Sequence, residues 1–362
     1  MPSGPPYPSP NAGLGGQPTV DVDVPITSVF LFLYILGAVS HMTILQINQR
    51  KGHKFLASGA LFGFCMARIT TCIMRLVWAT HVTSVPIAIA ANVFVNAGVV
   101  IIIIINLIFA QRILRASHPK VGWSRFVHYA FLAYYLSIIR MLAALITSIV
   151  QQSYTLDGNI RRIDRDIQLV GATYNTVAAF LPILLLIIGV VLPKLQQSGG
   201  WSASRKIDKF GTGRFRSKIR ILLLSTLLIT LGAAFRCGIA YVPRPADDPA
   251  WYHSKACFYC FNFVVEVVVI FMYAVVRVDR RFHIPNGAKG EGSYSGDKVL
   301  SKKTLSDRVE GDEEFLDDFR PADGKTESGG AEDMEASAVE WEKKTEIELQ
   351  NGITEPPAVR VV

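Results

Sequence analysis

Residues 85–110 read VPIAIAANVFVNAGVVIIIIINLIFA, a stretch of 26 residues without a charged side chain. An α-helix rises about 1.5 Å per residue and the hydrocarbon core of a bilayer is about 30 Å thick, so roughly 20 apolar residues cross it. This stretch is therefore predicted to be a transmembrane helix. A helix of this length fits either a plasma membrane or an endomembrane when it is tilted, so its length does not indicate which membrane contains the protein.

Six other apolar stretches of similar length lie on either side of this one. We expect seven transmembrane helices, at about residues 25–46, 56–79, 85–110, 126–150, 168–192, 219–242 and 256–278. The composition agrees, because 50% of the residues are hydrophobic and 18% are charged, which is too apolar for a soluble domain. The predicted fold class is all-α, an integral membrane bundle over residues 25–285.

Lysine and arginine are concentrated in alternate loops of the predicted bundle. The loops after the first, third and fifth predicted helices carry three groups: Arg50, Lys51 and Lys54; Arg112, Arg115, Lys120 and Arg125; and Lys194, Arg205, Lys206, Lys209, Arg214, Arg216, Lys218 and Arg220. Residues 1–24 carry none. Since cytoplasmic loops collect these residues, we expect the N-terminus outside and the C-terminus in the cytosol.

Both ends of the chain are predicted to be disordered. Residues 1–24 begin with a segment rich in proline, glycine and serine, which buries too little apolar surface to fold. Residues 286–362 are glycine-rich and then acidic, and they are predicted to form a cytosolic tail. Residues 1–290 contain 28 Lys and Arg against 10 Asp and Glu, whereas residues 291–362 contain 9 against 19.

This charge distribution bears on the partners of the protein. A basic membrane domain suits an anionic cytoplasmic leaflet, so membrane lipids explain the net charge of +8 and no nucleic-acid partner is expected. The basic inner loops and the acidic tail are candidate docking sites for a cytosolic protein.

Five charged residues lie deep inside the predicted helices, away from their ends. They are Arg68, Arg75, Arg140, Arg236 and Glu266. An arginine at the centre of a bilayer costs at least about 2.5 kcal/mol, so each one needs a partner. Depth along the helices groups Arg68, Arg140 and Glu266 near the midplane, and Arg75 with Arg236 nearer the outside. Since one glutamate neutralises one arginine, the excess of positive charge predicts a cavity for an anionic or amphipathic small molecule.

Two asparagines extend this predicted site. Asn92 and Asn96 are four residues apart on the third helix and therefore lie on one face of it, and Gly98 follows them, where a small residue permits close helix approach. We expect them to line the same cavity. An alternative is equally open: these polar groups hold the bundle together through hydrogen bonds and one buried pair, Arg68 or Arg140 with Glu266.

The chain has five cysteines, and three of them fall near the predicted outer face. A disulfide from Cys237 to Cys257 or Cys260 would hold the loop between the last two helices, with free membrane cysteines as the alternative. Cys257 and Cys260 form a C-x-x-C with His253 nearby, but three ligands at one helix start predict no metal.

No catalytic motif is present in the sequence. It lacks H-E-x-x-H, G-x-x-x-x-G-K-[ST] and G-x-S-x-G, and the predicted helices contain a single acidic residue. The sequence therefore predicts neither an enzyme nor a cofactor.

Several strings of residues resemble known families. The strings HKF at 53–55, FCMAR at 64–68, RLVWA at 75–79, NLIFAQRILR at 106–115 and HP at 118–119 resemble, over residues 25–290, a fungal multi-pass membrane family described as a domain of unknown function. More loosely, Glu266, Tyr273, Asp279 and the HIP at 283–285 are similar to the fungal lipid-translocating-exporter-like family. These resemblances imply a fungal host and an accessory role beside a metabolic pathway.

Three functions are compatible with this sequence. The first is handling or export of a lipid or an anionic or amphipathic metabolite. The second is a seven-transmembrane receptor, although the third helix ends in Ala110-Gln111-Arg112 without the acidic-arginine pair typical of receptors. The third is a membrane scaffold for pathway enzymes. In each case the protein is expected in the plasma membrane or an endomembrane.

Overall fold

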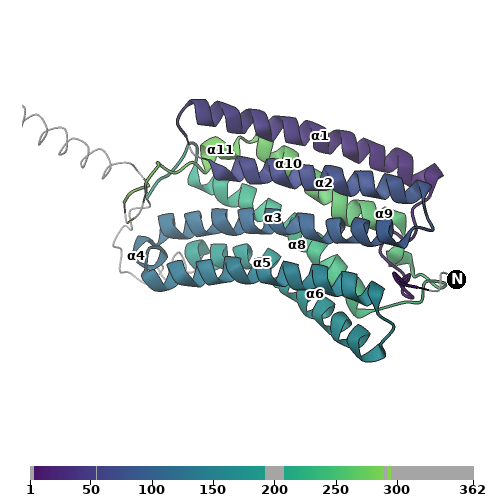
Figure 1. Ribbon diagram of the computed structural model, residues 1–362. Helices are drawn as coiled ribbons and strands as arrows, with labels where there is room; N and C mark the ends of the chain where they lie inside the picture. Colours follow the sequence, from purple (N-terminus) through teal and green to yellow (C-terminus); the bar gives the residue numbers. More distant parts are fainter. Residues whose placement is uncertain (1–3, 54, 192–207, 289, 291, 295–362) are drawn as a thin grey trace, which may run out of the picture. The chain divides into compact units, whose positions relative to one another are not determined.

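The computed structural model describes residues 4–53, 55–191, 208–288, 290 and 292–294. The long helices are α1 (Val20–Arg50), α2 (Leu56–Thr80), α3 (Val85–Ser117), α5 (Arg125–Tyr154), α6 (Gly158–Leu186) and α8 (Phe215–Tyr241), shown in Figure 1. The last long segment consists of α9 (Lys255–Phe258), the π-helix η4 (Tyr259–Val264) and α10 (Val265–Val275). The short elements are α4 (Pro119–Gly122), η1 (Ile187–Val191), η3 (Trp251–His253) and α11 (Val278–Arg281).

The prediction of seven transmembrane helices is confirmed. Seven segments are long and apolar enough to cross a membrane, which is the architecture of a multi-pass membrane protein. The largest difference from the sequence-based bounds is at α6, which begins at Gly158 and not near residue 168. Asp157 caps this helix, because its side chain accepts a hydrogen bond from the backbone N–H of Asn159 at 2.8 Å. Arg161, Arg162 and Arg165, expected in a loop, are therefore helical.

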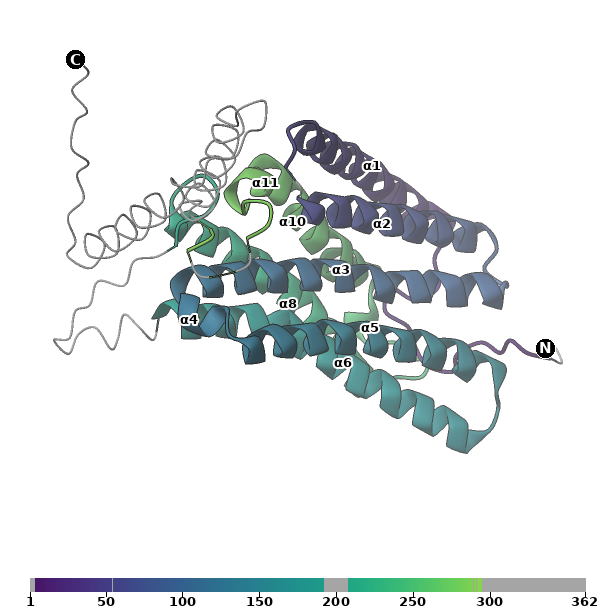
Figure 2. The ribbon, with the colours of Figure 1, turned by 60° about the vertical axis from the view of Figure 1, so that its left-hand side comes forward.

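Helix α3 lies at the centre of the bundle and α5 at its edge. In the most hydrophobic part of each helix, 56% of α3 is buried but 11% of α5. Helices α1, α2 and α3 pack in sequence, and α3 also contacts α5, α6 and α8. Helix α10 packs against both α1 and α8, while α6 runs obliquely beside α5 in Figures 1 and 2.

A buried polar cluster joins three of these helices. The Tyr273 hydroxyl of α10 donates to the Ser225 hydroxyl of α8 at 2.7 Å, and Ser225 donates to the Asn106 side chain of α3 at 3.1 Å. All three side chains are buried. Interhelical hydrogen bonds of this kind stabilise membrane bundles. This cluster therefore fits the alternative in which buried polar residues hold the helices together.

Small residues allow two pairs of helices to approach closely. A Cβ on Gly232 of α8 would lie 2.5 Å from the carbonyl oxygen of Phe261 in η4, and a Cβ on Gly171 of α6 would lie 2.5 Å from a methyl group of Leu145 in α5. Neither contact leaves room for a larger side chain, which is the usual reason for glycine at such crossings.

The prediction of a disordered N-terminus is wrong for residues 4–19. Backbone hydrogen bonds join Tyr7 to Ser153 at 2.7 Å and Ala12 to Arg244 at 2.8 Å, and the N–H of Gly15 donates to the carbonyl of His253 at 3.0 Å. This segment therefore lies across the end of the bundle at which α1 begins, and we call it the N-terminal strap. Its glycines and prolines follow an irregular path because the neighbouring loops accept and donate its backbone hydrogen bonds.

The C-terminal boundary of the membrane domain also lies later than residue 285. The Asn286 side chain donates to the carbonyl of Gly52 at 2.7 Å, and Tyr294 is buried against Trp123 and Phe210. The acidic tail at 295–362 and residues 192–207 of the long basic loop lie outside the described residues.

Two histidines meet at the end of the bundle opposite the strap, and one of them is expected to make the stability of the bundle dependent on pH. Nδ1 of His53 lies 2.8 Å from Nε2 of His283, beside a small cavity lined by Lys51, Asp279 and Arg280. Burial and the neighbouring His53 and Arg112 lower the pKa of His283 below its usual 6.5. A group whose pKa is lowered by folding binds more protons when unfolded, so its contribution is complete above about pH 6.5 and is lost as the pH falls.

We therefore expect the melting temperature to fall between neutral pH and pH 5, because protonation of His283 puts a charge on a partly buried ring beside Arg112. The corresponding loss in the free energy of unfolding should be about 1 kcal/mol, the value of one hydrogen bond, and it should be absent in His283→Gln. The exposed His128→Gln at the same end is the control and should melt as the wild type does at each pH. Equal pH dependence in both variants would refute the role of the pair.

Candidate functional site

A buried ion pair occupies the middle of the bundle. Arg68 of α2 donates to both carboxylate oxygens of Glu266 in α10, at 2.6 Å from Nε and 2.5 Å from Nη2. Its remaining nitrogen, Nη1, donates to the carbonyls of Phe94 and Val95 in α3, at 3.3 and 2.9 Å. The Arg68 and Glu266 side chains are 0% and 1% exposed. Four of the five N–H groups of this guanidinium are thus hydrogen-bonded within the bundle.

The surroundings of the pair hold it in this geometry. The Tyr34 hydroxyl donates to Glu266 at 3.3 Å, and the Arg68 guanidinium lies over the rings of Phe64 and Phe263. A Cβ on Gly98 would lie 2.9 Å from Cζ of Arg68, so the glycine makes room for the guanidinium. Arg68 and Glu266 therefore fit the alternative in which buried polar groups hold the bundle together, because they join α2, α3 and α10.

Arg75 has a different acidic partner, Asp23 of α1. Its Nη2 and Nε lie 2.8 and 3.3 Å from Oδ1 of Asp23. The guanidinium also donates to the carbonyls of Gly15 and Gly16 in the strap, at 3.0 and 3.4 Å, and stacks on the ring of Phe258 at 4.5 Å. Arg75 thus ties the strap to α1 and α2.

Asp23 is the centre of this network. Besides Arg75, its carboxylate lies 2.5 Å from Nζ of Lys255 and accepts hydrogen bonds from the Tyr259 hydroxyl and the Thr19 backbone, both at 2.8 Å. The residue is 1% exposed. Two cations around one carboxylate leave a net positive charge at this end of the bundle.

Arg236 lies near the buried pair of Arg68 and Glu266 but forms no ion pair of its own with a described residue. Its Nη1 donates to the side-chain oxygen of Asn262 at 3.1 Å, and Asn262 is placed by the π-helical turn η4. Arg236 lines a cavity of about 300 Å³ together with Asn92 and Asn96. The structure therefore brings together three of the residues that the sequence predicted at a common cavity.

Helix α6 completes this cavity, which we call the arginine cavity. Arg165 and Gln168 line it from α6, and Gln168 donates to the Gln152 side chain of α5 at 2.8 Å. Arg165 forms no ion pair with any described residue, and its side chain is exposed. Two guanidinium groups and several amides thus face one cavity, and no described carboxylate lines it.

A second, larger cavity adjoins the arginine cavity across the strap. Its volume is about 830 Å³, and it shares with the arginine cavity Asn92 and five residues between Ser9 and Leu14. Apolar side chains from α2 and α3 line part of it, namely Trp78, Val85, Ala88 and Ile89. We call it the strap cavity.

Two side chains of the strap cavity have buried polar atoms without a partner in the described part of the chain. Neither ring nitrogen of His253 is hydrogen-bonded, although this residue is 4% exposed, and Nε1 of Trp78 is also unpaired. Burial and Arg244 lower the pKa of His253 from 6.5, so at neutral pH its ring has one donor and one acceptor. Buried polar groups are nearly always hydrogen-bonded, so these atoms indicate a place for a ligand or water.

Arg140 is placed differently from the prediction. It is exposed on α5, at the edge of the bundle, and lines neither the arginine cavity nor the strap cavity. The depth argument placed it near the midplane, but it could not show which face of α5 is buried.

The predicted disulfide is not formed. All five cysteines lie in the described part of the chain and are free. Cys237 faces α6, where its sulfur lies 3.7 Å from the Thr173 hydroxyl, whereas the Cys257 thiol points to the carbonyl of Trp251 at 4.0 Å. The two sulfurs therefore contact different elements.

Comparison with known proteins gives one partial match. A family model described as a protein of unknown function (DUF3112) matches residues 214–283, from α8 to α11. No curated protein and no solved structure matches the chain. Resemblance to a family of unknown function is thus confirmed over a shorter segment than the predicted 25–290. The matched segment contains Arg236, His253 and Glu266, one residue each of the arginine cavity, the strap cavity and the buried ion pair.

Proposed function

We propose that the arginine cavity and the strap cavity together bind an amphipathic organic anion. The anionic group lies between Arg165 and Arg236, and the apolar part extends into the strap cavity beside Trp78 and Ile89. The observation that carries this proposal is the coincidence of unpaired polar atoms and open volume: Arg165 and the ring of His253 lack partners among the described residues and line adjoining cavities.

The chemistry of the lining supports an anion. A guanidinium presents planar N–H donors that match a carboxylate or phosphate, and two of them suit a full negative charge without help from a lysine. Asn92 and Asn96 add amide groups, and neutral His253 can donate to or accept from a hydroxyl or carbonyl farther along the ligand. An apolar solute with no charge would offer neither arginine an acceptor.

The position of the cavities suits handling of membrane-derived molecules. They lie at the end of the bundle where α1 begins and α2 ends, which the sequence predicts to be extracytoplasmic. A ligand of this class partitions into lipid and reaches the site from the membrane interface. Handling or export of a lipid or an amphipathic metabolite is the function that we propose for this protein.

Neutralising Arg165 is expected to weaken binding without unfolding the protein. Purified full-length protein in nanodiscs is titrated with a fluorescent long-chain carboxylate, and the affinity of Arg165→Gln should fall about 10- to 100-fold, the value of a lost charge-assisted hydrogen bond. Because Arg165 is exposed and forms no ion pair with a described residue, the melting temperature should not change.

Arg162→Gln is the matched control. Arg162 is exposed one turn earlier on α6 and does not line the arginine cavity. It should bind the carboxylate as the wild type does, and the uncharged alcohol of the same chain length should bind neither protein well. Equal losses in Arg165→Gln and Arg162→Gln would reduce the effect to general surface charge and refute the site.

Movement of the same probe across liposomes tests the transport part of the proposal. Wild-type protein should accelerate flux, and Arg165→Gln should reduce it in proportion to the loss of binding. Binding without any flux would keep the ligand site and rule out export.

A further inference from the structure

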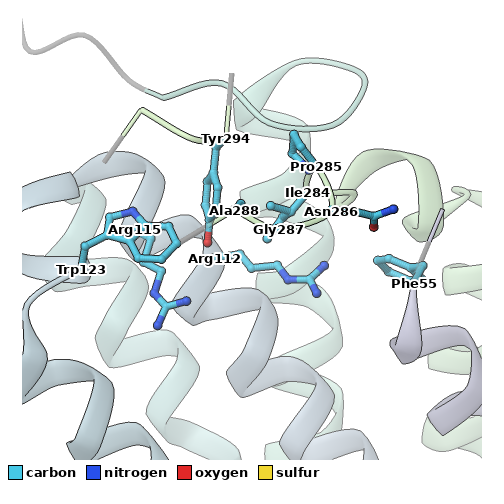
Figure 3. Close-up of a pocket in the computed structure, with 10 residues that line it drawn as sticks. All are labelled: Phe55, Arg112, Arg115, Trp123, Ile284, Pro285, Asn286, Gly287, Ala288 and Tyr294. Carbon is cyan, nitrogen blue, oxygen red and sulfur yellow. The ribbon is translucent and has the colours of Figure 1, made fainter. Parts of the chain in front are cut away.

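A pocket of about 340 Å³ opens at the end of the bundle opposite the strap. It is lined by Arg112 and Arg115 of α3, Trp123 before α5, Phe55, and residues 284–288 with Tyr294 from the segment after α11. In Figure 3 the Tyr294 side chain reaches in between Trp123 and Arg115 on one side and Arg112 on the other. We call it the inner arginine pocket. It is separate from the site of the proposed function.

Arg112 is held by one hydrogen bond and by contacts with two aromatic rings. Its Nη1 donates to the carbonyl of Phe282 at 2.6 Å, and the guanidinium lies 5.5 Å from the centre of the Phe55 ring and 5.9 Å from that of Phe109. Within the described part of the chain it forms no ion pair. The group is thus oriented but not neutralised.

Arg115 is oriented in the same manner. It is three residues after Arg112 and therefore on the same face of α3. Its Nε donates to the carbonyl of Gly122 at 3.2 Å, and its guanidinium stacks on Trp123 at 4.5 Å from the ring centre. No described carboxylate pairs with it either.

The pocket also contains an unused donor. Nε1 of Trp123 is buried and has no hydrogen-bond partner in the described part of the chain. An N–H in this state costs free energy unless something accepts its hydrogen bond.

We propose that the inner arginine pocket binds the phosphate monoester of a hydrophilic headgroup. Such a group carries a charge of about −1.5 to −2 at neutral pH and three acceptor oxygens, which match two preoriented guanidinium groups and the N–H of Trp123. A single carboxylate would leave one cation unbalanced. The pocket lies where α3 ends at Ser117, close to the level expected for lipid headgroups, and its volume exceeds that of a bare phosphate.

The same phosphate chemistry occurs in phosphoinositide lipids and in soluble sugar phosphates, and binding assays on the full-length protein distinguish them. Nanodiscs of phosphatidylcholine with and without a phosphatidylinositol phosphate provide the lipid, and a soluble inositol phosphate and inorganic phosphate provide the free probes. We expect the protein to bind the inositol phosphate group, either as part of the lipid or as the soluble compound. A preference for the lipid identifies a membrane lipid as the source, and equal affinity identifies a soluble ester.

Three variants test the residues. Arg112→Gln and Arg115→Gln should each weaken binding of the inositol phosphate about 10- to 100-fold, and Trp123→Phe, which keeps the ring but removes the N–H, should weaken it about 3- to 10-fold. Arg125→Gln, an exposed arginine at the start of α5 outside the pocket, is the control and should bind normally.

The melting temperature of each variant without ligand shows whether it is folded. Arg112→Lys and Arg115→Lys keep the charge and lose the planar fork, so they should recover little of the lost affinity. Binding that falls equally in Arg125→Gln, or that lysine fully restores, would show unspecific attraction of anions and overturn the proposal. Binding of inorganic phosphate but not of the inositol phosphate would overturn it as well, because the pocket would then not accommodate the headgroup.

Discussion

Glu266→Gln is expected to destabilise the bundle by about 3–5 kcal/mol, one of the two largest effects that we predict. The substitution keeps the size of the side chain and removes its charge. Arg68, which is 0% exposed, would then remain charged without an anion, although it keeps its bonds to two carbonyls of α3. Equilibrium unfolding in mixed micelles with increasing SDS measures this loss directly.

The double variant Arg68→Leu with Glu266→Leu is the control for this effect. Replacing a buried pair by apolar side chains is often close to neutral, so the double variant should be clearly more stable than Glu266→Gln. A double variant as unstable as the single one would show that packing at this position matters and not the unpaired charge. Binding at the arginine cavity should persist in the double variant, because neither residue lines it.

Asp23→Asn is expected to have an effect of similar size at the strap end of the bundle. Asp23 is buried and forms ion pairs with both Arg75 and Lys255, so its loss leaves two cations without their anion and costs about 3–5 kcal/mol. Because Arg75 also holds the carbonyls of Gly15 and Gly16, the strap should detach as well. Faster amide hydrogen exchange in residues 7–16 measures that detachment.

Asp21→Asn provides the comparison for this variant. Asp21 is exposed two residues earlier in the same helix and forms no ion pair with any described residue. Its substitution should change the free energy of unfolding by less than about 0.5 kcal/mol, as is usual for surface positions. Equal exchange of the strap in both variants would contradict the account of Asp23.

Hydropathy predicted the helices well because each one must supply about 20 apolar residues to cross the membrane. Intramembrane charge limited the partner of Glu266 to Arg68 or Arg140, and the structure shows the pair with Arg68. Depth alone could not tell which face of a helix is buried. Arg140 shows this, because the depth argument grouped it with Glu266 and yet it lies on the exposed side of α5.

The residues that the prediction missed belong to segments that look polar in sequence. Asp23 was placed in a disordered terminus and Arg165 in a loop, because a hydropathy window ends where charges begin. Asp157 was a signal for α6, since an aspartate before a helix is a preferred cap, and it would have placed Arg165 and Gln168 on the first turns of that helix. The buried state of His253 depends on the strap and has no local signature.

The two arginine sites lie at opposite ends of the bundle and differ in what surrounds them. At the strap end the cavities are large and partly apolar, which suits an amphipathic ligand. At the other end the arginines stack on aromatic rings in a smaller pocket, which suits a compact and strongly charged group. The buried pair Arg68–Glu266 lies between them and joins three helices.

Photo-crosslinking tests the central claim most directly. A long-chain carboxylate with a photoreactive group in its chain is bound to the full-length protein in nanodiscs, and the labelled residues are mapped by mass spectrometry. We predict labels on residues 9–14 and on α3 near Ile89 and Asn92, reduced in Arg165→Gln and unchanged in Arg162→Gln. Labels confined to exposed side chains of α5, such as Leu132, Leu136 and Ile139, and equal in both variants, would contradict a ligand site at the strap.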